Sequence, residues 1–271
     1  SNAGRTSDHL SMPKRSEVLA LATLVCDAEL AARRPRTSHQ QQWCESVFHL
    51  GVLATYELTG DERYLEETTR WCEDRQWELG PRPLHADDHS AAQVYLELRE
   101  LAGEERGLPA VTETFEAVLS ESLAGHELWP WCDALFMAPP AMAQLSEISG
   151  DRRYATAMDA MWWDVRDHLY DADWLLFHRD ARQRARAEKL DREVDGGPGT
   201  GMSPGSDARA GGGTAADGPR PEVTAPRFWA RGNGWVMAGA ARVLEALPPG
   251  HPSRAEYERL LGEMASAVAE A

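Results

Sequence analysis

The sequence predicts an all-α protein in which inner and outer helices alternate as hairpins around a toroid. Three observations support this fold class: strand signals are scarce, helix signals recur, and the helical segments repeat one plan along the chain. An α-solenoid of stacked hairpins is the alternative, and the repeat period alone does not exclude it. With 271 residues, of which 42% are hydrophobic, the chain is long enough to bury a sizeable core.

Two segments carry the repeat most clearly. One reads WCESVFHLGVLATYELTGDERY from Trp43, and the other reads WCDALFMAPPAMAQLSEISGDRRY from Trp131. The glycine of each Gly-Asp turn suits the left-handed residue that ends a helix, and Asp61 or Asp151 is suited to cap the next helix. Residues 85–124 and 229–270 follow the same plan less closely.

In each repeat the first helix is apolar nearly all round, whereas the second is amphipathic and more charged. A helix that is apolar on all sides is buried, and an amphipathic one faces water on one side. The apolar positions are Val47, Phe48, Leu50, Val52, Leu53 and Tyr56 in one repeat, and Leu135, Phe136, Met137, Met142, Leu145 and Ile148 in another. The nine predicted helices cover residues 12–34, 43–58, 61–78, 87–103, 108–124, 131–148, 151–170, 230–246 and 252–270.

The predicted domain covers residues 11–271, after a tag and tail at 1–10. Its first helix should bury one face, formed by Val18, Leu19, Ala22, Val25 and Cys26. A Gly/Pro-rich insertion at about residues 181–226 lacks apolar periodicity and is predicted to be a flexible loop.

The cysteines form no CxxC pair and are expected to be small core thiols. They are Cys26, Cys44, Cys72 and Cys132.

Charge and hydropathy exclude two classes of partner. The net charge of −16 argues against a nucleic-acid-binding face, which would be basic. A membrane span is not expected, because no uninterrupted apolar stretch approaches about 18 residues. Ser1-Asn2-Ala3 resembles an expression scar, and Gly4 follows it. A trimmed signal peptide would indicate a periplasmic or exported protein, and its absence a cytoplasmic one; the sequence leaves this open.

Three segments with chemically active side chains each begin an inner helix. They are HADDHSAAQVYLEL from His85, ELWPWCDALFMAPP from Glu127 and RFWARGNGWVMAGAARVLEALP from Arg227. If all inner helices point the same way, these starts gather at one mouth of the toroid. Carboxylates, an arginine and several tryptophans would then face a common pocket.

Each candidate residue in these segments also has a structural interpretation. Asp87 and Asp88 are suited to cap a helix, but at most one can do so and nothing local pairs with the other. A lone carboxylate at Asp133, in an otherwise apolar helix, would be costly unless it is paired, which favours a functional role over a structural one. Arg231 stands between Trp229 and Trp235, which favours ligand contact.

Tryptophan is more abundant than a core requires. The chain has ten Trp against five Phe, and pyranose rings stack on such faces, although core packing explains any single Trp equally well. A metal cluster at His85, Asp87, Asp88 and His89 is not expected, because side chains this close on one helix start do not converge on one ion. No cofactor is expected.

The three segments resemble those of the unsaturated glucuronyl and rhamnogalacturonyl hydrolases of glycoside hydrolase family 105, which is related to family 88. The resemblance lies in kind and order: an Asp-bearing start before an inner helix, then WCDALFMAPP, then FWARGNGW. It implies an (α/α)6 barrel that removes a 4,5-unsaturated uronic acid from the non-reducing end of lyase-generated oligosaccharides, above all pectin fragments of the rhamnogalacturonan type. A full barrel has twelve helices, so the resemblance implies that the last three are absent. Such an open ring would expose apolar flanks and favour a homo-oligomer.

The resemblance also assigns roles to residues. Asp133 matches the general acid of the family, and Asp88 matches its second essential carboxylate, with Asp87 leaving the register ambiguous. The family's WxRxxxW substrate-holding pattern matches Trp229, Arg231 and Trp235. To the expected substrate-binding set we add the neighbouring motif residues Asp87, His85, His89 and Trp131.

The chemistry of the family explains these residue types. An acid protonates C4 of the C4=C5 vinyl ether, water adds at C5, and the hemiketal collapses. Raising the pKa of Asp133 from about 3.9 to about 6–7 means roughly 3–4 kcal/mol of destabilisation of its anion. An apolar wall and a second carboxylate both act in that direction, with Asp88 holding water or sharing the proton. Arg231 would meet the substrate carboxylate, which a chain of net charge −16 otherwise repels.

Two other functions remain open from the sequence. One is a non-catalytic carbohydrate-binding or assembly module derived from the same family. The other is an ordinary inverting glycosidase on a related toroid, acting on saturated glycosides.

Overall fold

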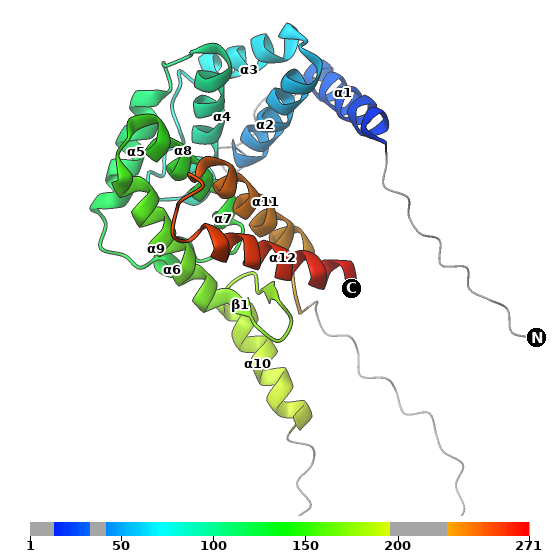
Figure 1. Cartoon of the computed structure of the whole chain (residues 1–271), viewed down its shortest axis with the longest axis vertical. Coiled ribbons are helices and arrows are strands. Elements are labelled where there is room, and N and C mark those ends of the chain that lie inside the picture. Colours follow the sequence, from blue (N-terminus) through cyan, green and yellow to red (C-terminus); the bar gives the residue numbers. More distant parts are fainter. Residues whose placement is uncertain (1–13, 33–41, 196–226, 271) are drawn as a thin grey trace, which may run out of the picture. The chain divides into compact units, whose positions relative to one another are not determined.

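The computed structural model describes residues 14–32, 42–195 and 227–270. Figure 1 shows its helices, which are α1 (Arg15–Ala32), α2 (Gln42–Thr59), α3 (Glu62–Asp74), α4 (Ala86–Ala102), α5 (Leu108–Ser120), α6 (Gly125–Leu128), α7 (Ala134–Met137), α8 (Pro139–Ser149), α9 (Arg152–Leu169), α10 (Ala181–Asp195), α11 (Ala230–Ala246) and α12 (Arg254–Glu270). Two short antiparallel strands, β1 (Tyr170–Asp171) and β2 (Leu176–Phe177), follow α9. Among the described helices, none is long and apolar enough to cross a membrane.

The chain divides into two compact units. The first consists of Ser1–Ser122 and Met137–Ala157, and the second of Leu123–Phe136 and Met158–Ala271. The first unit therefore holds α1 to α5 and α8, and the second holds the strands and α10 to α12.

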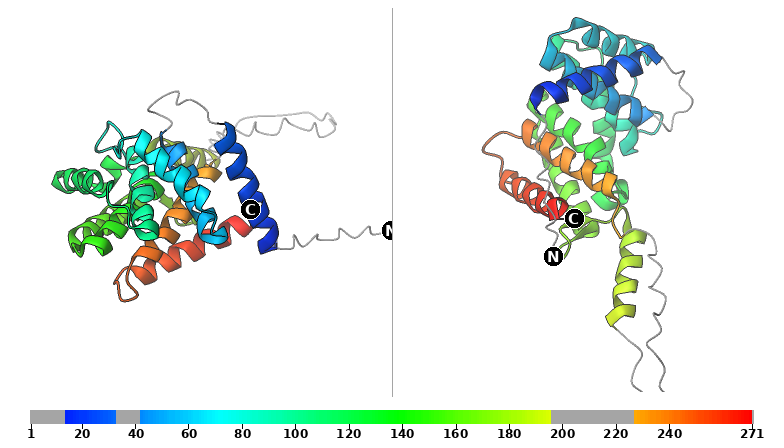
Figure 2. Two further views of the ribbon diagram at one scale, coloured as in Figure 1. Left: turned by 90° about the horizontal axis from the view of Figure 1, so that it is seen from above. Right: turned by 90° about the vertical axis from the view of Figure 1, so that its right-hand side faces the viewer.

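Two layers of helices build the first unit. Helix α4 packs against both α2 and α8, and these three form an inner row, while α1, α3 and α5 pack on its outer side (Figures 1 and 2). Nearly every residue of α4 between Ala86 and Leu98 is buried, whereas α3 buries one face. The predicted alternation of buried inner helices and amphipathic outer helices is confirmed for α4 and α8 against α3, whereas the inner helix α2 is less buried than predicted and keeps Gly51 and Ala54 exposed.

The repeated Gly-Asp turns fold as predicted. Gly60 and Gly150 adopt the left-handed conformation, with φ of 68° and 71°. The carboxylates of Asp61 and Asp151 then accept the backbone N–H two residues on, at 3.1 and 3.0 Å. Each turn thus ends one helix and caps the next, because glycine tolerates positive φ and aspartate satisfies a free N–H.

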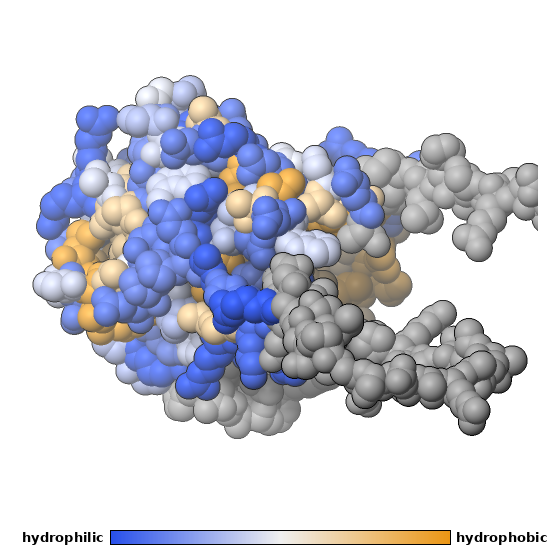
Figure 3. All heavy atoms as spheres, turned by 90° about the horizontal axis from the view of Figure 1, so that it is seen from below, coloured by the Kyte–Doolittle hydropathy of each residue, from blue (hydrophilic) through white to orange (hydrophobic). Residues whose placement is uncertain are grey.

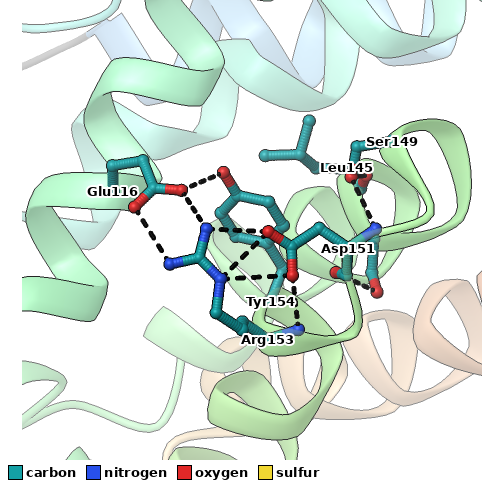
Figure 4. A network of polar contacts seen from close by, with 7 residues as sticks. Glu116, Leu145, Ser149, Asp151, Arg153 and Tyr154 are labelled. Atoms are coloured by element: carbon teal, nitrogen blue, oxygen red, sulfur yellow. Dashed lines mark hydrogen bonds and ion pairs between the residues drawn. The ribbon is translucent and has the colours of Figure 1, made fainter.

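The same turns tie neighbouring outer helices together through an arginine. Figure 4 shows the guanidinium of Arg153 between Asp151 and Glu116, at 2.7 Å from each, while the Tyr154 hydroxyl donates to Glu116 at 2.7 Å. Arg63 lies in the same way between Asp61 and Asp27. At the third turn, after Gly103, Arg106 pairs with Glu104 and with Glu73 of α3. The acid–arginine–acid pattern therefore recurs at three turns of the first unit.

Helix α1 buries only part of the predicted face: Cys26 is buried and Leu19 and Ala22 are partly buried. Val18 and Val25 are 49% and 48% exposed, so their assignment to the buried face is wrong. Cys26 is buried and, with Leu30, packs against the cluster of Val52 and Tyr64. The buried side of α1 therefore excludes Val18 and Val25, whose apolar side chains lie at the surface. Elsewhere the visible surface is mostly hydrophilic (Figure 3).

Three further predictions of local structure are wrong. The helix predicted at 131–148 is two helices, α7 and α8, because Pro139 and Pro140 lack the N–H that would continue the first and are accommodated in the first turn of the second.

Residues 181–195 form α10 rather than a loop; this segment has good helix formers and an Arg184–Glu188 pair one turn apart. Residues 196–226 of the predicted loop lie outside the described residues. Cys44 is exposed, whereas the other three cysteines are buried.

Candidate active site

The start of α4 carries the first predicted motif, and a histidine caps it. His85 is the N-cap residue, and its Nδ1 accepts the backbone N–H of Asp87 at 3.3 Å. Asp87 and Asp88 both lie in the first helical turn, where a negative charge interacts favourably with the helix dipole. The structural interpretation of either aspartate as the N-cap is therefore wrong.

Asp88 is buried in a cradle made by the preceding loop. Its carboxylate accepts the backbone N–H of Arg82 at 2.8 Å and the guanidinium Nε at 3.1 Å, and Nη2 lies 2.5 Å from the other oxygen. The Asp88 side chain is 1% exposed. A Cβ on Gly80 would lie 2.0 Å from Asp88 Cγ, so this loop position requires glycine. The expectation that nothing local pairs with the second aspartate is wrong, since Arg82 does.

Asp87 and His89 occupy different environments. Asp87 is half-buried, and burial raises the pKa of its carboxyl group while His85 and Arg82 oppose the rise. His89 is fully buried with Nε2 at 2.7 Å from the carbonyl oxygen of Pro83, and its ring meets Phe115 edge-on. Burial lowers the pKa of His89 to about 4, so this ring is neutral at pH 7. The structure thus places Asp87 and His85 side by side at the surface of this motif and turns His89 into the core.

Asp133 lies in a turn before α7 rather than within a helix. It is partly buried, less than predicted from its apolar neighbours, and follows the fully buried Cys132. The backbone N–H of Cys132 donates to the carbonyl of Arg179 at 3.0 Å, and Trp131 forms an isolated bridge with Asp180. Burial, and next the charge of Asp133, raises the pKa of the Cys132 thiol. The segment that follows β2 therefore fixes the backbone that presents Asp133.

The N-terminus of α11 packs against this turn within the same unit. A Cβ on Gly232 would lie 2.8 Å from Cys132 Sγ and 2.3 Å from the Trp229 ring. Two turns further on, a Cβ on Gly239 would lie 2.3 Å from the carbonyl oxygen of Leu135. These close approaches bring two of the predicted motifs, WCDALFM and FWARGNGW, together in the second unit.

The residues of the predicted WxRxxxW pattern lie at the start of α11. The Arg231 guanidinium lies 5.0 Å from the centre of the Trp229 ring, and Arg231 is exposed. Trp235 is partly buried against Phe136, at 4.9 Å between ring centres. Trp131 is 43% exposed, so its ring is accessible at the surface. A cation and aromatic rings therefore lie on the helix start that packs against Cys132, the residue before Asp133.

Asn233 lies within the FWARGNGW motif, but the sequence alone does not indicate its role. It is buried, and its side chain accepts the N–H of Phe177 at 2.7 Å and donates to the Phe177 carbonyl at 2.9 Å and to that of Trp229 at 3.2 Å. Its amide thus replaces a strand partner for β2 and holds the start of α11. The Asn-Gly pair is an unusual helix start, which is the one sequence feature that points to this residue.

A second group missed by the sequence analysis surrounds Asp171 of β1. His178 is buried, with Nε2 at 3.3 Å from Asp171 Oδ2, and its ring stacks on Phe228 at 4.9 Å. Arg227 approaches the same oxygen at 3.7 Å. Burial lowers the pKa of His178, and Asp171 opposes this. Because two-residue strands leave no periodic pattern, the hairpin that assembles this group could not be found from the sequence.

Comparison with known families shows to which family the chain is related. The family model described as Glycosyl Hydrolase Family 88 matches residues 25–198 and 216–271, which include all three motifs. The chain belongs to glycosyl hydrolase family 88. The resemblance inferred from the motifs is thereby confirmed.

Two family 88 relatives bear the name unsaturated 3S-rhamnoglycuronyl hydrolase. The one from Alteromonas sp. (strain LOR) is 30% identical over 250 residues, which are 84% of this chain and 52% of the relative. The one from Formosa agariphila is 28% identical over 247 residues, which are 84% of this chain and 57% of the relative. The chain therefore spans about half the length of these relatives.

Solved structures share the family 88 fold. A glycosyl hydrolase family 88 protein from Bacteroides vulgatus matches with a TM-score of 0.72 and 22% identity over 95% of this chain and 69% of its own. A family 105 glycoside hydrolase from C. acetobutylicum matches with a TM-score of 0.63 and 17% identity over 95% of this chain and 66% of its own. The predicted fold class is confirmed by these likenesses.

Proposed function

We propose that this chain is an unsaturated uronyl hydrolase, which removes a 4,5-unsaturated uronic acid from the non-reducing end of an oligosaccharide. The observation that carries the proposal is the family 88 match across all three motifs. The relatives' name supports it and directs the substrate towards an unsaturated glycuronyl residue joined to rhamnose. Fragments released by lyases from rhamnose-containing uronic acid polysaccharides are the substrate class.

The proposed reaction is hydration of the C4=C5 vinyl ether. The carboxyl group of Asp133 donates a proton to C4, and water adds its oxygen at C5 and releases a proton. The hemiketal at C5 opens by breaking the bond between C5 and the ring oxygen, which leaves a ketone at C5 and a hemiacetal at C1. This hemiacetal then collapses to an aldehyde and releases the neighbouring sugar with its oxygen protonated. A carboxyl group suits the first step because it delivers a proton to carbon from a partly buried position, at a turn fixed by the Cys132 and Trp131 backbone contacts.

Of the two adjacent aspartates, we assign contact with the substrate or the attacking water to Asp87. It is half-buried, and burial raises its pKa, so it can exchange a proton nearer to neutral pH than an exposed aspartate. Asp88 acts through Arg82, which covers its carboxylate, and is a positioning residue in this proposal. The sequence left open which of the two aspartates matches the second essential carboxylate of the family, and this proposal chooses Asp87.

The uronate carboxyl group of the substrate is proposed to bind Arg231. This arginine is exposed and already lies over the Trp229 ring, so it can turn its guanidinium edge to a carboxylate while the aromatic face supports its plane. Trp131 and Trp235 are proposed to contact the sugar faces.

The proposal is tested by following the ultraviolet absorbance of the substrate alkene in lyase digests of rhamnogalacturonan and of ulvan. The chain should abolish this absorbance, and Asp133→Asn should lower kcat by about 10²–10⁴-fold, because it removes the proton donor and keeps the side-chain shape. Asp173→Asn is the matched control, since Asp173 is exposed in the loop of the β1–β2 hairpin.

Each other outcome has a distinct meaning. If calorimetry detects binding that depends on Trp229 while the alkene persists, the chain is a carbohydrate-binding module. If a saturated chromogenic glycoside is cleaved and the alkene is not, the chain is an ordinary glycosidase. Full activity of Asp133→Asn would exclude Asp133 as the acid.

A further inference from the structure

We infer that His126, Asp164 and His168 form a binding site for a divalent transition metal ion of the zinc type. All three residues belong to the second unit: His126 is in α6, and the other two are one turn apart on α9. One ligand atom from each lies within 4.8 Å of the others. None of the three residues belongs to the motifs that carry the proposed hydrolase activity, and His126 directly precedes the second of these motifs.

The distances fit a small coordination sphere. His126 Nδ1 lies 2.7 Å from Asp164 Oδ2, and His168 Nδ1 lies 3.7 Å from Asp164 Oδ1. Neighbouring ligands of a tetrahedral ion with bonds of about 2.0–2.2 Å are separated by about 3.3–3.6 Å. The observed spacings lie on both sides of that value, so side-chain rotations that open the ring stack bring two nitrogens and one oxygen to one ion, with water as the remaining ligand.

The two histidine rings and the carboxylate of the site already contact one another. The two imidazole rings stack nearly parallel, with centres 3.4 Å apart and planes inclined by 11°. Asp164 connects α9 to His126, because its Oδ2 accepts the backbone N–H of His126 at 2.7 Å and lies 2.7 Å from His126 Nδ1.

Metal binding requires a defined rearrangement. The proton that His126 Nδ1 shares with Asp164 moves to Nε2 or to solvent, and His168 Nδ1 leaves the Asp164 carbonyl oxygen, 2.9 Å away. The in-plane lone pairs of parallel rings do not meet, so the stack must open. The His126, Asp164 and His168 side chains are 35%, 32% and 46% exposed, which leaves room for this motion and for entry of the ion.

An ion bound here would link helix α6 to helix α9. Helix α6 is already close to α9, since a Cβ on Gly125 would lie 2.3 Å from the carbonyl oxygen of Met161. Five residues after α6 comes Asp133. An ion bridging His126 to α9 would clamp the segment that leads to this turn.

The test uses the full chain stripped of metal with EDTA. Zn²⁺ is added in calorimetry and in thermal unfolding, and Co²⁺ serves as a spectroscopic probe of tetrahedral coordination. The wild-type chain should bind one Zn²⁺ and melt at a higher temperature with the metal, because the ion binds the folded state. His126→Ala and His168→Ala should each weaken binding by at least about tenfold. His251→Ala, which removes a histidine from the loop before α12, should bind as the wild type does.

The inference is overturned if the wild-type chain shows neither heat of binding nor a thermal shift with Zn²⁺, or if His126→Ala and His168→Ala bind as tightly as wild type. A measurement without substitutions guards against misfolded variants. In histidine-ring NMR of the wild-type chain, Zn²⁺ should move two ring signals and remove their mutual ring-current shift, and perturbation of other histidines alone would also overturn the inference.

Discussion

At the scale of single residues, two adjacent carboxylates lie in different environments. Asp88 is sealed by three contacts from Arg82, whereas Asp87 is half-buried beside His85 with a raised pKa. The sequence indicated this pair as candidate functional residues but did not separate their environments, because these depend on the loop between Gly80 and His85. That loop has no periodic pattern, and its fit around Asp88 is visible only in three dimensions.

Replacing each aspartate of this pair by asparagine should separate activity from stability. Asp88→Asn should lower the free energy of unfolding by about 1.5–3 kcal/mol, because it weakens charge-assisted hydrogen bonds to Arg82. Asp87→Asn should leave stability unchanged or higher, since burial disfavours its carboxylate, and should lower kcat by about 10²-fold or more. Urea unfolding and the alkene assay measure the two effects. The reverse pattern, an inactive but stable Asp88→Asn beside an active Asp87→Asn, would return the substrate contact to Asp88.

His89 should make the folded state sensitive to acid. Its pKa is about 4 in the folded chain against 6.5 for an ordinary histidine, so the unfolded chain binds more protons between these values. This contribution to stability is complete above pH 6.5 and is lost as the pH falls to about 4, a loss of about 3 kcal/mol. Asp87 opposes it, because its raised pKa favours the folded chain as the pH falls.

The measurement is urea unfolding of wild type and His89→Gln at several pH values between 4 and 6.5. The difference in unfolding free energy between the two should shrink as the pH falls, since glutamine does not titrate. His251→Gln serves as the control and should run parallel to wild type. A constant difference between wild type and His89→Gln across this range would show that His89 is not the group that titrates.

At the scale of elements, the sequence predicted what repeats and missed what occurs once. The Gly-Asp turns recur with the same glycine and aspartate, so Gly60, Asp61, Gly150 and Asp151 could be assigned before the structure. The two-residue strands, the break at Pro139 and the polar helix α10 each occur once. None of them has the apolar periodicity on which the prediction of helices depends.

Helix α11 offers a sharp test of close packing, because two glycines stand two residues apart. A methyl group on Gly232 would meet the Trp229 ring and Cys132 Sγ, whereas one on Gly234 has nothing within 4 Å. Gly232→Ala should therefore destabilise the chain by about 1–3 kcal/mol and lower activity by shifting Trp229. Gly234→Ala should stabilise it by up to about 1 kcal/mol through helix propensity. Thermal unfolding compares them, and equal effects of the two substitutions would contradict the packing of α11 on the Cys132 turn.

At the scale of the whole molecule, composition excluded partners but did not identify the substrate. The family emerged from motifs within three segments, and the net charge by itself carries no such information. The charge does bear on how an acidic sugar reaches the protein. A chain with 44 acidic and 28 basic residues repels an anionic uronate at long range, while Arg231 attracts it at short range.

Ionic strength should therefore separate long-range repulsion from local binding. Raising the salt from about 0.01 M to about 0.15 M shortens the Debye length from about 30 Å to about 8 Å, which screens the distant acidic residues more than a direct ion pair. We expect kcat/KM for the unsaturated disaccharide to rise with salt and kcat to change little, because the chemical step follows binding. An Arg231→Gln variant should show a steeper relative rise, since it keeps the repulsion and loses the attraction. A fall of kcat/KM with salt in the wild type would mean that local cations outweigh the net charge in guiding the substrate.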